Sequence, residues 1–117
     1  MSDFVTLKSN PDFRRLYNRG KAITNPALVI YYSKNRAGIC RIGITTSKKI
    51  GNAVERNRSR RVLMEAFRSV CSRVKPEYDI VLVARSKTKY VKSTRLAEIM
   101  NDIFANEGML LTEGEER

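Results

Sequence analysis

The segment 48–61 concentrates the side chains of this chain that could bind a charged ligand. Its residues, KKIGNAVERNRSRR, include six cations and a single carboxylate, that of Glu55. A helix face that served only solubility would place acids four residues from its cations, and this segment does not. Guanidinium groups bind phosphate through paired hydrogen bonds, and a helix start adds N–H donors and a positive dipole end. The segment therefore predicts phosphate binding.

Three aromatic side chains, Phe13, Tyr17 and Tyr31, could act together with these cations. Single-stranded nucleic acid stacks its bases on aromatic rings, at about 1–3 kcal/mol per base, while cations hold its backbone. Tyr31 is expected beside Gly43 and Thr45 rather than beside large apolar groups, which favours an accessible ring. Phe13 could equally be an ordinary core residue, and the sequence leaves that alternative open.

Hydrolysis by the chain's own side chains is not predicted. The sequence has no histidine, no pair of acids in the basic segment, and no phosphate-binding loop or nucleophile motif. Glu55 stands where a helix-capping carboxylate is expected, which explains it without catalysis. Two cysteines without histidine cannot form a zinc site of ordinary composition. We predict no catalytic and no metal-ligating residues, and we expect Cys40 and Cys71 in the core.

The net charge of +11 is distributed unevenly along the chain. Residues 1–92 hold 21 of the 23 Lys and Arg residues and 6 of the 12 acids, a net charge of +15, whereas residues 93–117 carry −4. This polarity points to a polyanionic partner bound away from the C-terminal segment. No protein partner is predicted.

Nucleic acid is favoured over a membrane as that partner. No run approaches the roughly 18 apolar residues that a membrane span needs, and no basic helix carries an apolar anchoring face. The first residues lack the basic stretch and apolar core of a signal peptide. We therefore expect a cytoplasmic protein whose thiols stay reduced.

Capping residues and alternation define the elements of the first half of the chain. Asn10 and Pro11 favour a helix start, and Gly20 favours its end. Two strands, 27–32 and 39–47, follow across a short turn. Alternation assigns Leu28, Ile30, Tyr32, Cys40, Ile42 and Ile44 to the core face, and Ala27, Val29, Tyr31, Gly43, Thr45 and Ser47 to the other face. The second set predicts an open sheet face that could bind a ligand.

A second helix is expected to begin near Ala53, because Asn52 and Glu55 have the spacing of a capping box. It can run to about Val74. Its buried stripe is predicted to contain Val62, Leu63, Ala66, Phe67, Val70 and Val74. At about 100° per residue, Arg58 and Arg61 point away from this stripe with Glu65 and Arg68, whereas Arg56 and Arg60 lie at its edge near the sheet.

The last elements complete a single domain. Residues 80–84 form an unbroken apolar run, which predicts a strand buried on both faces. Residues 96–104 repeat apolar side chains at helical spacing and predict a third, core-facing helix. The order α-β-β-(β)-α-β-α indicates an α+β two-layer sandwich with a parallel crossover. We interpret residues 1–117 as one RNA-binding domain whose ends, 1–9 and 108–117, are flexible.

Residues 47–68, SKKIGNAVERNRSRRVLMEAFR, closely resemble the signature of the bacterial ribonuclease P protein component. The specific part is Arg56-Asn57-Arg58, with Lys48-Lys49, Gly51-Asn52-Ala53-Val54, Arg60-Arg61 and Ala66-Phe67 around it. Upstream, the residues that also look like that family are Asn10-Pro11-Asp12-Phe13, Tyr17, Gly20 and the strand bearing Tyr31. The resemblance covers roughly residues 5–105 and leaves the acidic tail, residues 113–117, outside.

This resemblance implies a ribonucleoprotein subunit. Members of the family bind a large catalytic RNA, and that RNA with Mg²⁺ removes the 5′ leader from precursor tRNA. The chain would then belong to an endoribonuclease of tRNA processing, with the catalytic RNA and precursor tRNA as partners and Mg²⁺ required by the complex. The family's fold is ribosomal-protein-like, with a left-handed crossover against the right-handed default.

The resemblance also implies residue roles. The catalytic RNA would be held by Lys48, Lys49, Arg56, Asn57, Arg58, Arg60, Arg61 and Arg68. The leader would lie in a cleft between the first helix and the sheet, against Phe13, Tyr17, Tyr31, Thr45, Ser47, Arg56 and Asn57. The chain departs from the family at Met64, where a basic residue is common, and at Ser59, where an apolar residue is usual.

Two other interpretations use the same charges. A ribosomal or chaperone-like RNA-binding protein would carry the basic segment without a leader cleft. A self-sufficient nuclease would need acid and base groups, which the segment lacks.

Overall fold

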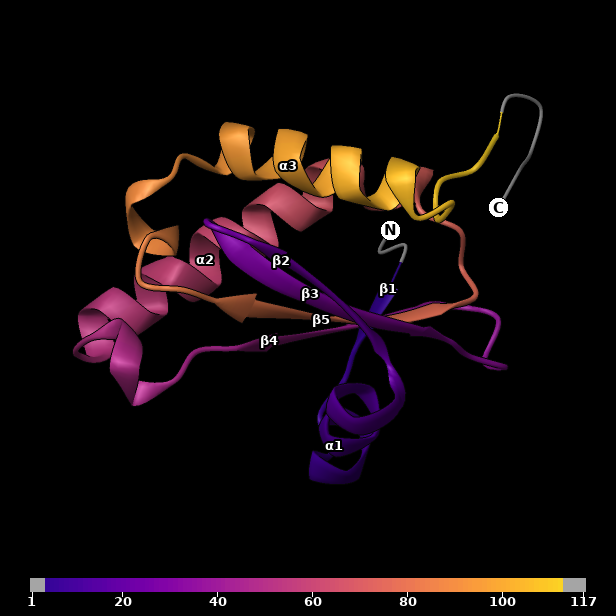
Figure 1. Ribbon diagram of the computed structural model, residues 1–117, viewed down its shortest axis with the longest axis horizontal. Helices are drawn as coiled ribbons and strands as arrows, with labels where there is room; N and C mark the ends of the chain where they lie inside the picture. The colour runs from indigo at the N-terminus through magenta and orange to yellow at the C-terminus, as the bar shows by residue number, and fades with distance from the viewer. Residues whose placement is uncertain (1–3, 113–117) are drawn as a thin grey trace.

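A five-stranded sheet carries helices on both of its faces (Figure 1). The computed structural model describes residues 4–112. Its elements, in chain order, are β1 (Phe4–Thr6), α1 (Asn10–Arg19), β2 (Lys21–Asn25), β3 (Leu28–Lys34), β4 (Cys40–Thr45), the 3₁₀ turn η1 (Lys48–Ile50), α2 (Ala53–Val70), the 3₁₀ turn η2 (Cys71–Arg73), β5 (Tyr78–Ala84), the 3₁₀ turn η3 (Thr88–Tyr90) and α3 (Ser93–Asn106). Across the sheet the strands follow the order β1-β4-β5-β3-β2.

β5 lies at the centre of the sheet because its residues are apolar toward both faces. Ile80, Val81 and Leu82 are fully buried, as the apolar run predicts. β5 pairs in parallel with β4 and antiparallel with β3, so the two strands predicted on either side of the short turn are not neighbours.

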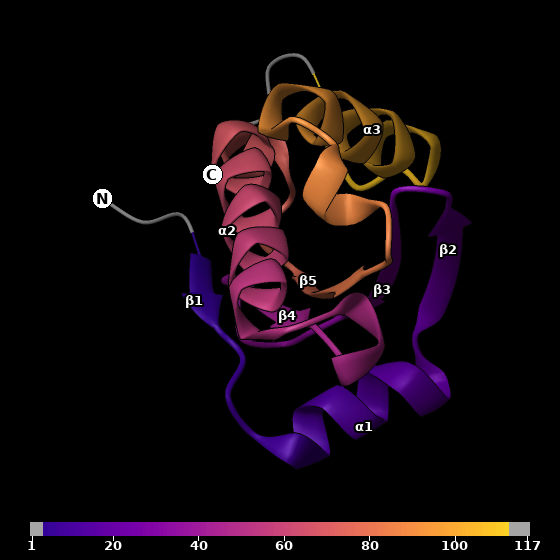
Figure 2. The same ribbon diagram turned by 90° about the vertical axis from the view of Figure 1, so that its left-hand side faces the viewer.

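The crossover from β4 through α2 to β5 is left-handed. In Figure 2 both strands run toward the viewer, α2 lies above them, and β5 lies to the right of β4. This hand is the opposite of the strong default for parallel strands. The expectation that came from the family resemblance is therefore confirmed.

The main core lies between the sheet and the pair α2 and α3 (Figure 1). Leu63 and Phe67 of α2 and Met100 and Phe104 of α3 are fully buried there. Both cysteines are buried in the same core, as predicted. The predicted α+β arrangement of a sheet under a helical layer is confirmed.

The opposite sheet face is less open than its alternation predicted, because α1 packs on it (Figure 1). Leu16 is fully buried with Leu7 and Val81 in a smaller second core, against which Phe13 and Tyr31 pack. The space for this contact comes from glycine. A Cβ atom at position 43 would lie 2.6 Å from the Phe13 ring.

Ala27 does not lie on this second face, contrary to the prediction. It is buried in the main core, because it belongs to the turn between β2 and β3 and does not follow the alternation of a strand. Its N–H donates to the Asn25 side chain at 2.8 Å, a contact typical of turns.

The capping box predicted for α2 is present. The Asn52 N–H donates to the Glu55 carboxylate at 3.0 Å, and the Glu55 N–H donates to the Asn52 side chain at 2.9 Å. The helix ends at Val70 rather than near Val74, because the chain tightens into η2.

None of the helices within residues 4–112 is both long enough and apolar enough to cross a membrane.

The start of α1 lies one residue earlier than predicted. Ser9, not Asn10, is the N-cap, because Ser9 has the extended backbone of a cap and its hydroxyl accepts the Asp12 N–H at 3.3 Å. The predicted end is confirmed, since the N–H of Gly20 closes the helix on the Leu16 carbonyl at 2.9 Å.

The first and last described residues pack against the rest of the domain. Residues 4–6 form β1, which pairs in parallel with β4, and Leu7 is buried. Met109 is fully buried, and Leu110 forms a bridge with Val74. Leu7 and Met109 therefore bury apolar side chains against the domain, and the flexibility expected of residues 1–9 and 108–117 stays a prediction. Residues 1–3 and 113–117, with the acidic tail, lie outside the described residues.

Candidate nucleic-acid interface

A cleft lies between α1, the end of β4 and α2; we name it the α1 cleft. It consists of two neighbouring hollows that share Phe13, Ile44 and Arg60. The other lining residues are Thr6, Leu7, Asn10, Tyr17, Ile42, Thr45, Thr46 and Met64. The cleft is therefore apolar and aromatic along its floor, with a guanidinium group at its wall.

The aromatic rings of the α1 cleft hold one another in place. The Tyr17 and Tyr31 rings meet edge to face with centroids 4.9 Å apart, and the Phe13 ring centroid lies 6.5 Å from that of Tyr17. The Tyr17 hydroxyl is hydrogen-bonded to the Thr45 hydroxyl at 2.6 Å. Tyr17 nevertheless remains 38% exposed, so its ring is both fixed and accessible.

Phe13 and Tyr31 have more of a core role than Tyr17. Both are partly buried and pack against the smaller core. Phe13 also lines the cleft, so it is both a core residue and a ring that a ligand in the cleft could contact. Tyr31 is not among the lining residues, and its ring packs edge to face against the Tyr17 ring.

Arg60 brings positive charge to the α1 cleft from α2. Its guanidinium group donates to the Ile44 carbonyl at 3.1 Å and to the Thr46 hydroxyl at 3.0 Å. These bonds turn the exposed side chain toward the end of β4, on the sheet side that its helical angle predicted. Arg60 was predicted to contact the catalytic RNA, and its place in this cleft is an additional finding.

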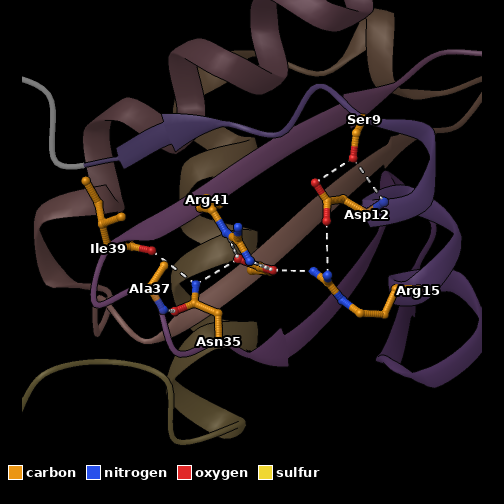
Figure 3. Close-up of polar contacts among 8 residues, drawn as sticks. Ser9, Asp12, Arg15, Asn35, Ala37, Ile39 and Arg41 are labelled. Carbon is orange, nitrogen blue, oxygen red and sulfur yellow. Dashed lines mark hydrogen bonds and ion pairs between the residues drawn. The ribbon is translucent and has the colours of Figure 1, made fainter.

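A buried carboxylate fastens α1 to the sheet (Figure 3). The Asp79 side chain on β5 is 1% exposed and accepts two hydrogen bonds of 2.7 Å from the Arg41 guanidinium of β4. It also accepts one at 2.5 Å from Arg15 of α1 and one at 2.7 Å from Asn35. Arg15 donates to Asp12 as well, at 3.0 Å. The orientation of α1, and with it the α1 cleft, rests on this buried charge.

Two members of this network, Asp12 and Arg41, favour their ionised forms. The Ser9 hydroxyl donates to the Asp12 carboxylate at 2.7 Å, and this bond, helped by Arg15, lowers the pKa of Asp12. The hydrogen bond to Asp79 raises the pKa of Arg41. The Asp12 carboxylate and the Arg41 guanidinium therefore remain charged across the neutral range.

A second surface lies on α2 and η1. Arg58, Arg61 and Arg68 are exposed and share one direction on the helix, and Lys48 and Lys49 are exposed in η1. We name these five residues the cationic face. Because no described acid forms an ion pair with them, their charges are available to an anionic ligand.

Other predicted site residues have different surroundings. Arg56 is half-buried and donates to the Gly51 carbonyl at 2.7 Å, which closes the loop before α2. Asn57 and Ser47 are exposed. These three residues do not line the α1 cleft, whereas Phe13, Tyr17 and Thr45 do.

Sequence reasoning missed several cleft residues. Asn10, Ile44, Thr46 and Met64 line it without having been predicted as site residues. Ile44 could have been inferred as a cleft residue, because it precedes the predicted site residue Thr45 in the predicted strand. Met64 follows Arg60 by one helical turn, so Arg60's position near the sheet indicates that of Met64 as well.

The single carboxylate of the basic segment is used structurally. Glu55 accepts the Asn52 N–H and forms an ion pair with Lys89 at 2.8 Å, and the bond to Lys89 is the main cause of its lowered pKa. Within residues 4–112, no three His, Cys, Asp or Glu side chains gather closely enough to hold a metal ion.

Comparison with known sequences gives one consistent family. A family model described as Ribonuclease P matches residues 1–107. The ribonuclease P protein component of Clostridioides difficile is 48% identical over 84 residues, which cover 71% of this chain and 74% of the relative. That of Oceanobacillus iheyensis is 37% identical over 106 residues, covering 89% and 87%.

Comparison with solved structures indicates the same family. The chain resembles the Staphylococcus aureus RNase P protein with a TM-score of 0.78 and 30% identity, over 91% of this chain and 97% of that one. The RNase P protein of Thermotoga maritima gives a TM-score of 0.76 and 27% identity, over 86% and 96%. The chain therefore belongs to the ribonuclease P protein family, whose members act with an RNA subunit in the removal of tRNA 5′ leaders.

Proposed function

We propose that the α1 cleft binds the single-stranded 5′ leader of precursor tRNA. The observation that carries this proposal is the fixed yet accessible Tyr17 ring, in a hollow that Arg60 also lines. An aromatic floor stacks bases of any sequence, and a guanidinium group neutralises the backbone that passes over it. Tyr31 contributes by supporting Tyr17.

The cationic face binds the catalytic RNA in this proposal. Folded RNA offers closely spaced phosphates, which suit exposed guanidinium groups without an acid partner. Ser47 immediately precedes η1, and Arg56 and Asn57 lie near the start of α2. They contact whichever RNA strand passes there, Ser47 and Asn57 through exposed polar side chains.

Catalysis belongs to the RNA with Mg²⁺, and the protein binds and positions. In this proposal the Mg²⁺ ions are held by the RNA, since the one carboxylate of the basic segment, Glu55, is already paired with Lys89. The reaction takes place in the cytoplasm, where Cys40 and Cys71 remain thiols.

Reconstitution tests whether the RNA carries the catalytic groups and the protein supports it. Purified protein, the ribonuclease P RNA of the same genome, and both together are incubated with precursor tRNA at low Mg²⁺. We expect 5′-leader cleavage only with the pair. Cleavage by the protein alone would mean that the chain carries catalytic groups of its own, and no stimulation by the protein would remove the proposed role.

Truncation of Tyr17 tests the leader site. We expect Tyr17→Ala to weaken binding of precursor tRNA to the assembled enzyme by about 1–3 kcal/mol, the contribution of one stacked base, and to leave mature tRNA binding unchanged. Tyr31→Ala should act in the same direction but less, because it acts through Tyr17. Tyr32→Phe, on the other sheet face, is the aromatic control. Equal losses on precursor and mature tRNA would remove these rings from the leader site.

A further inference from the structure

A second hollow lies on the other side of α2, where η3 and the start of α3 approach the helix. Figures 1 and 2 show η3 beside the first half of α2. We name it the Tyr90 groove, and its lining includes Arg58, Arg61, Glu65, Lys89, Tyr90 and Lys92. It shares no lining residue with the α1 cleft.

Tyr90 is exposed in a way that core packing does not explain. Its side chain is 77% exposed, although burying an aromatic ring would stabilise the fold. The Lys89 ammonium lies 5.3 Å from the ring centroid, so a cation already occupies the vicinity of the ring. The rest of the ring is available to a ligand.

The turn that presents Tyr90 is firmly anchored. Thr88 is buried, and its hydroxyl donates to the Ala27 carbonyl at 2.5 Å. The Lys89 ammonium donates to the Ile50 carbonyl at 2.7 Å and pairs with Glu55 at 2.8 Å. Because Tyr90 lies between held neighbours, little backbone entropy is lost when a ligand binds its ring.

The charges around Tyr90 fit a nucleotide. Lys89 is neutralised by Glu55, but Arg58, Arg61 and Lys92 are exposed. Three cations around one ring suit a phosphate on each side of a stacked base. Glu65 is the one carboxylate of the lining, and its oxygens can accept hydrogen bonds from a ribose hydroxyl or a base amino group.

We propose that the Tyr90 groove binds an unpaired nucleotide of the catalytic RNA, with the base on the Tyr90 ring and the flanking phosphates on Arg58, Arg61 and Lys92. This inference rests on the proposed function, because it names the catalytic RNA as the occupant. It adds base stacking to a surface that otherwise holds the RNA through charge alone.

Affinity measurements test the stacking. Binding of the ribonuclease P RNA to purified protein is measured at fixed salt for the wild type, Tyr90→Ala, Tyr90→Phe and the control Val5→Ala, which truncates an exposed residue of β1. We expect about a 10-fold loss of affinity for Tyr90→Ala and less than 2-fold for the other two, because phenylalanine still stacks. Because Tyr90 is exposed, its truncation should leave the fold intact, and a urea titration checks this.

A fluorescent reporter locates the bound RNA. The chain has no tryptophan, so Tyr90→Trp places the only indole of the protein in the groove. We expect saturable quenching of its emission by the catalytic RNA, reversed by high salt. Val5→Trp should remain unquenched.

The outcomes separate this inference from the proposed function. Wild-type protein that fails to bind the catalytic RNA would overturn the proposed function itself. Wild-type binding with equal affinity for Tyr90→Ala, or an unquenched tryptophan at saturating RNA, would overturn only the Tyr90 groove. Quenching by an acidic peptide but not by RNA would do the same, because it would make the occupant a protein segment.

Discussion

The cationic face and the α1 cleft are built in opposite ways. The cationic face comes from one continuous stretch, η1 and α2, and needs little more than a helix that begins at the right residue. The α1 cleft combines α1, the end of β4 and α2, which are separated along the chain. One surface is local, and the other exists only when the whole sheet has formed.

This difference follows from the forces that each surface uses. Charges attract phosphates over several ångströms, so a helix face can bind RNA without fixed side chains. Stacking requires a ring in contact with a base, so the α1 cleft needs a fixed ring and an anchored helix. The hydroxyl bond between Tyr17 and Thr45 fixes the ring, and Asp79 anchors the helix.

The largest effect is expected when the anchor of α1 is removed. Asp79→Ala leaves Arg15, Arg41 and Asn35 without their buried acceptor. Breaking a buried ion pair costs about 3–5 kcal/mol, and we expect the lower end because the two arginine side chains are 40% and 30% exposed and regain water. Urea unfolding measures the decrease in stability.

The same variant distinguishes the two surfaces. Leader affinity should fall more than affinity for the catalytic RNA, because only the α1 cleft depends on α1. Glu98→Ala, which removes an exposed ion pair with Arg95, should change the stability by less than about 0.5 kcal/mol. An equal decrease in affinity for the leader and for the catalytic RNA would show that the two surfaces are coupled through the fold.

The second-largest effect is expected when positive charge is removed from the cationic face. Arg58→Gln combined with Arg61→Gln should lower affinity for the catalytic RNA and reduce the slope of log K against log salt by about 0.7–0.9 for each phosphate that the variant no longer neutralises. Stability should stay unchanged, since both side chains are exposed. Arg36→Gln, in the turn between β3 and β4, is the matched control. An unchanged salt slope would remove these arginines from the interface.

The local surface is the one that the sequence predicted well. The capping box fixes where α2 begins, and from that residue the helical angle separates Arg58 and Arg61 from Arg60. Each of these inferences needs only near neighbours in the chain. The apolar run 80–84 was equally informative, because only a central strand is buried on both faces.

The cleft was predictable only in part, because the residues that form it are distant in sequence. Nothing near Asp79 indicates that Arg15 and Arg41 will meet it, since α1 reaches β5 only in the folded sheet. β1 is too short to recognise by alternation, and its three residues pair only with β4. The handedness of the crossover came from the family resemblance, against the general rule.

A smaller effect tests how tightly the ring is held. Tyr17→Phe removes the hydroxyl that bonds with Thr45 and keeps the ring for stacking. We expect stability to fall by about 0.5–1 kcal/mol and leader affinity to fall by less than with Tyr17→Ala. Thr45→Val should give a similar decrease, and the double variant should be destabilised by less than the sum of the two, because they share one bond. If the decreases in stability of the two single variants add up in the double variant, the hydrogen bond between the two hydroxyls does not stabilise the fold.

The smallest effect is the pH dependence of the α1 cap. The folded pKa of Asp12 is lowered by the Ser9 hydroxyl and by Arg15, so this carboxylate contributes stability above its unfolded pKa and loses that contribution as the pH falls through the folded pKa. Asp12→Asn has no such carboxylate to protonate. The difference in urea midpoint between wild type and Asp12→Asn should therefore be largest near neutral pH and shrink in acid. A difference that stays constant with pH would mean that the charge of Asp12 does not stabilise α1, and that the anchor of the α1 cleft is Asp79 alone.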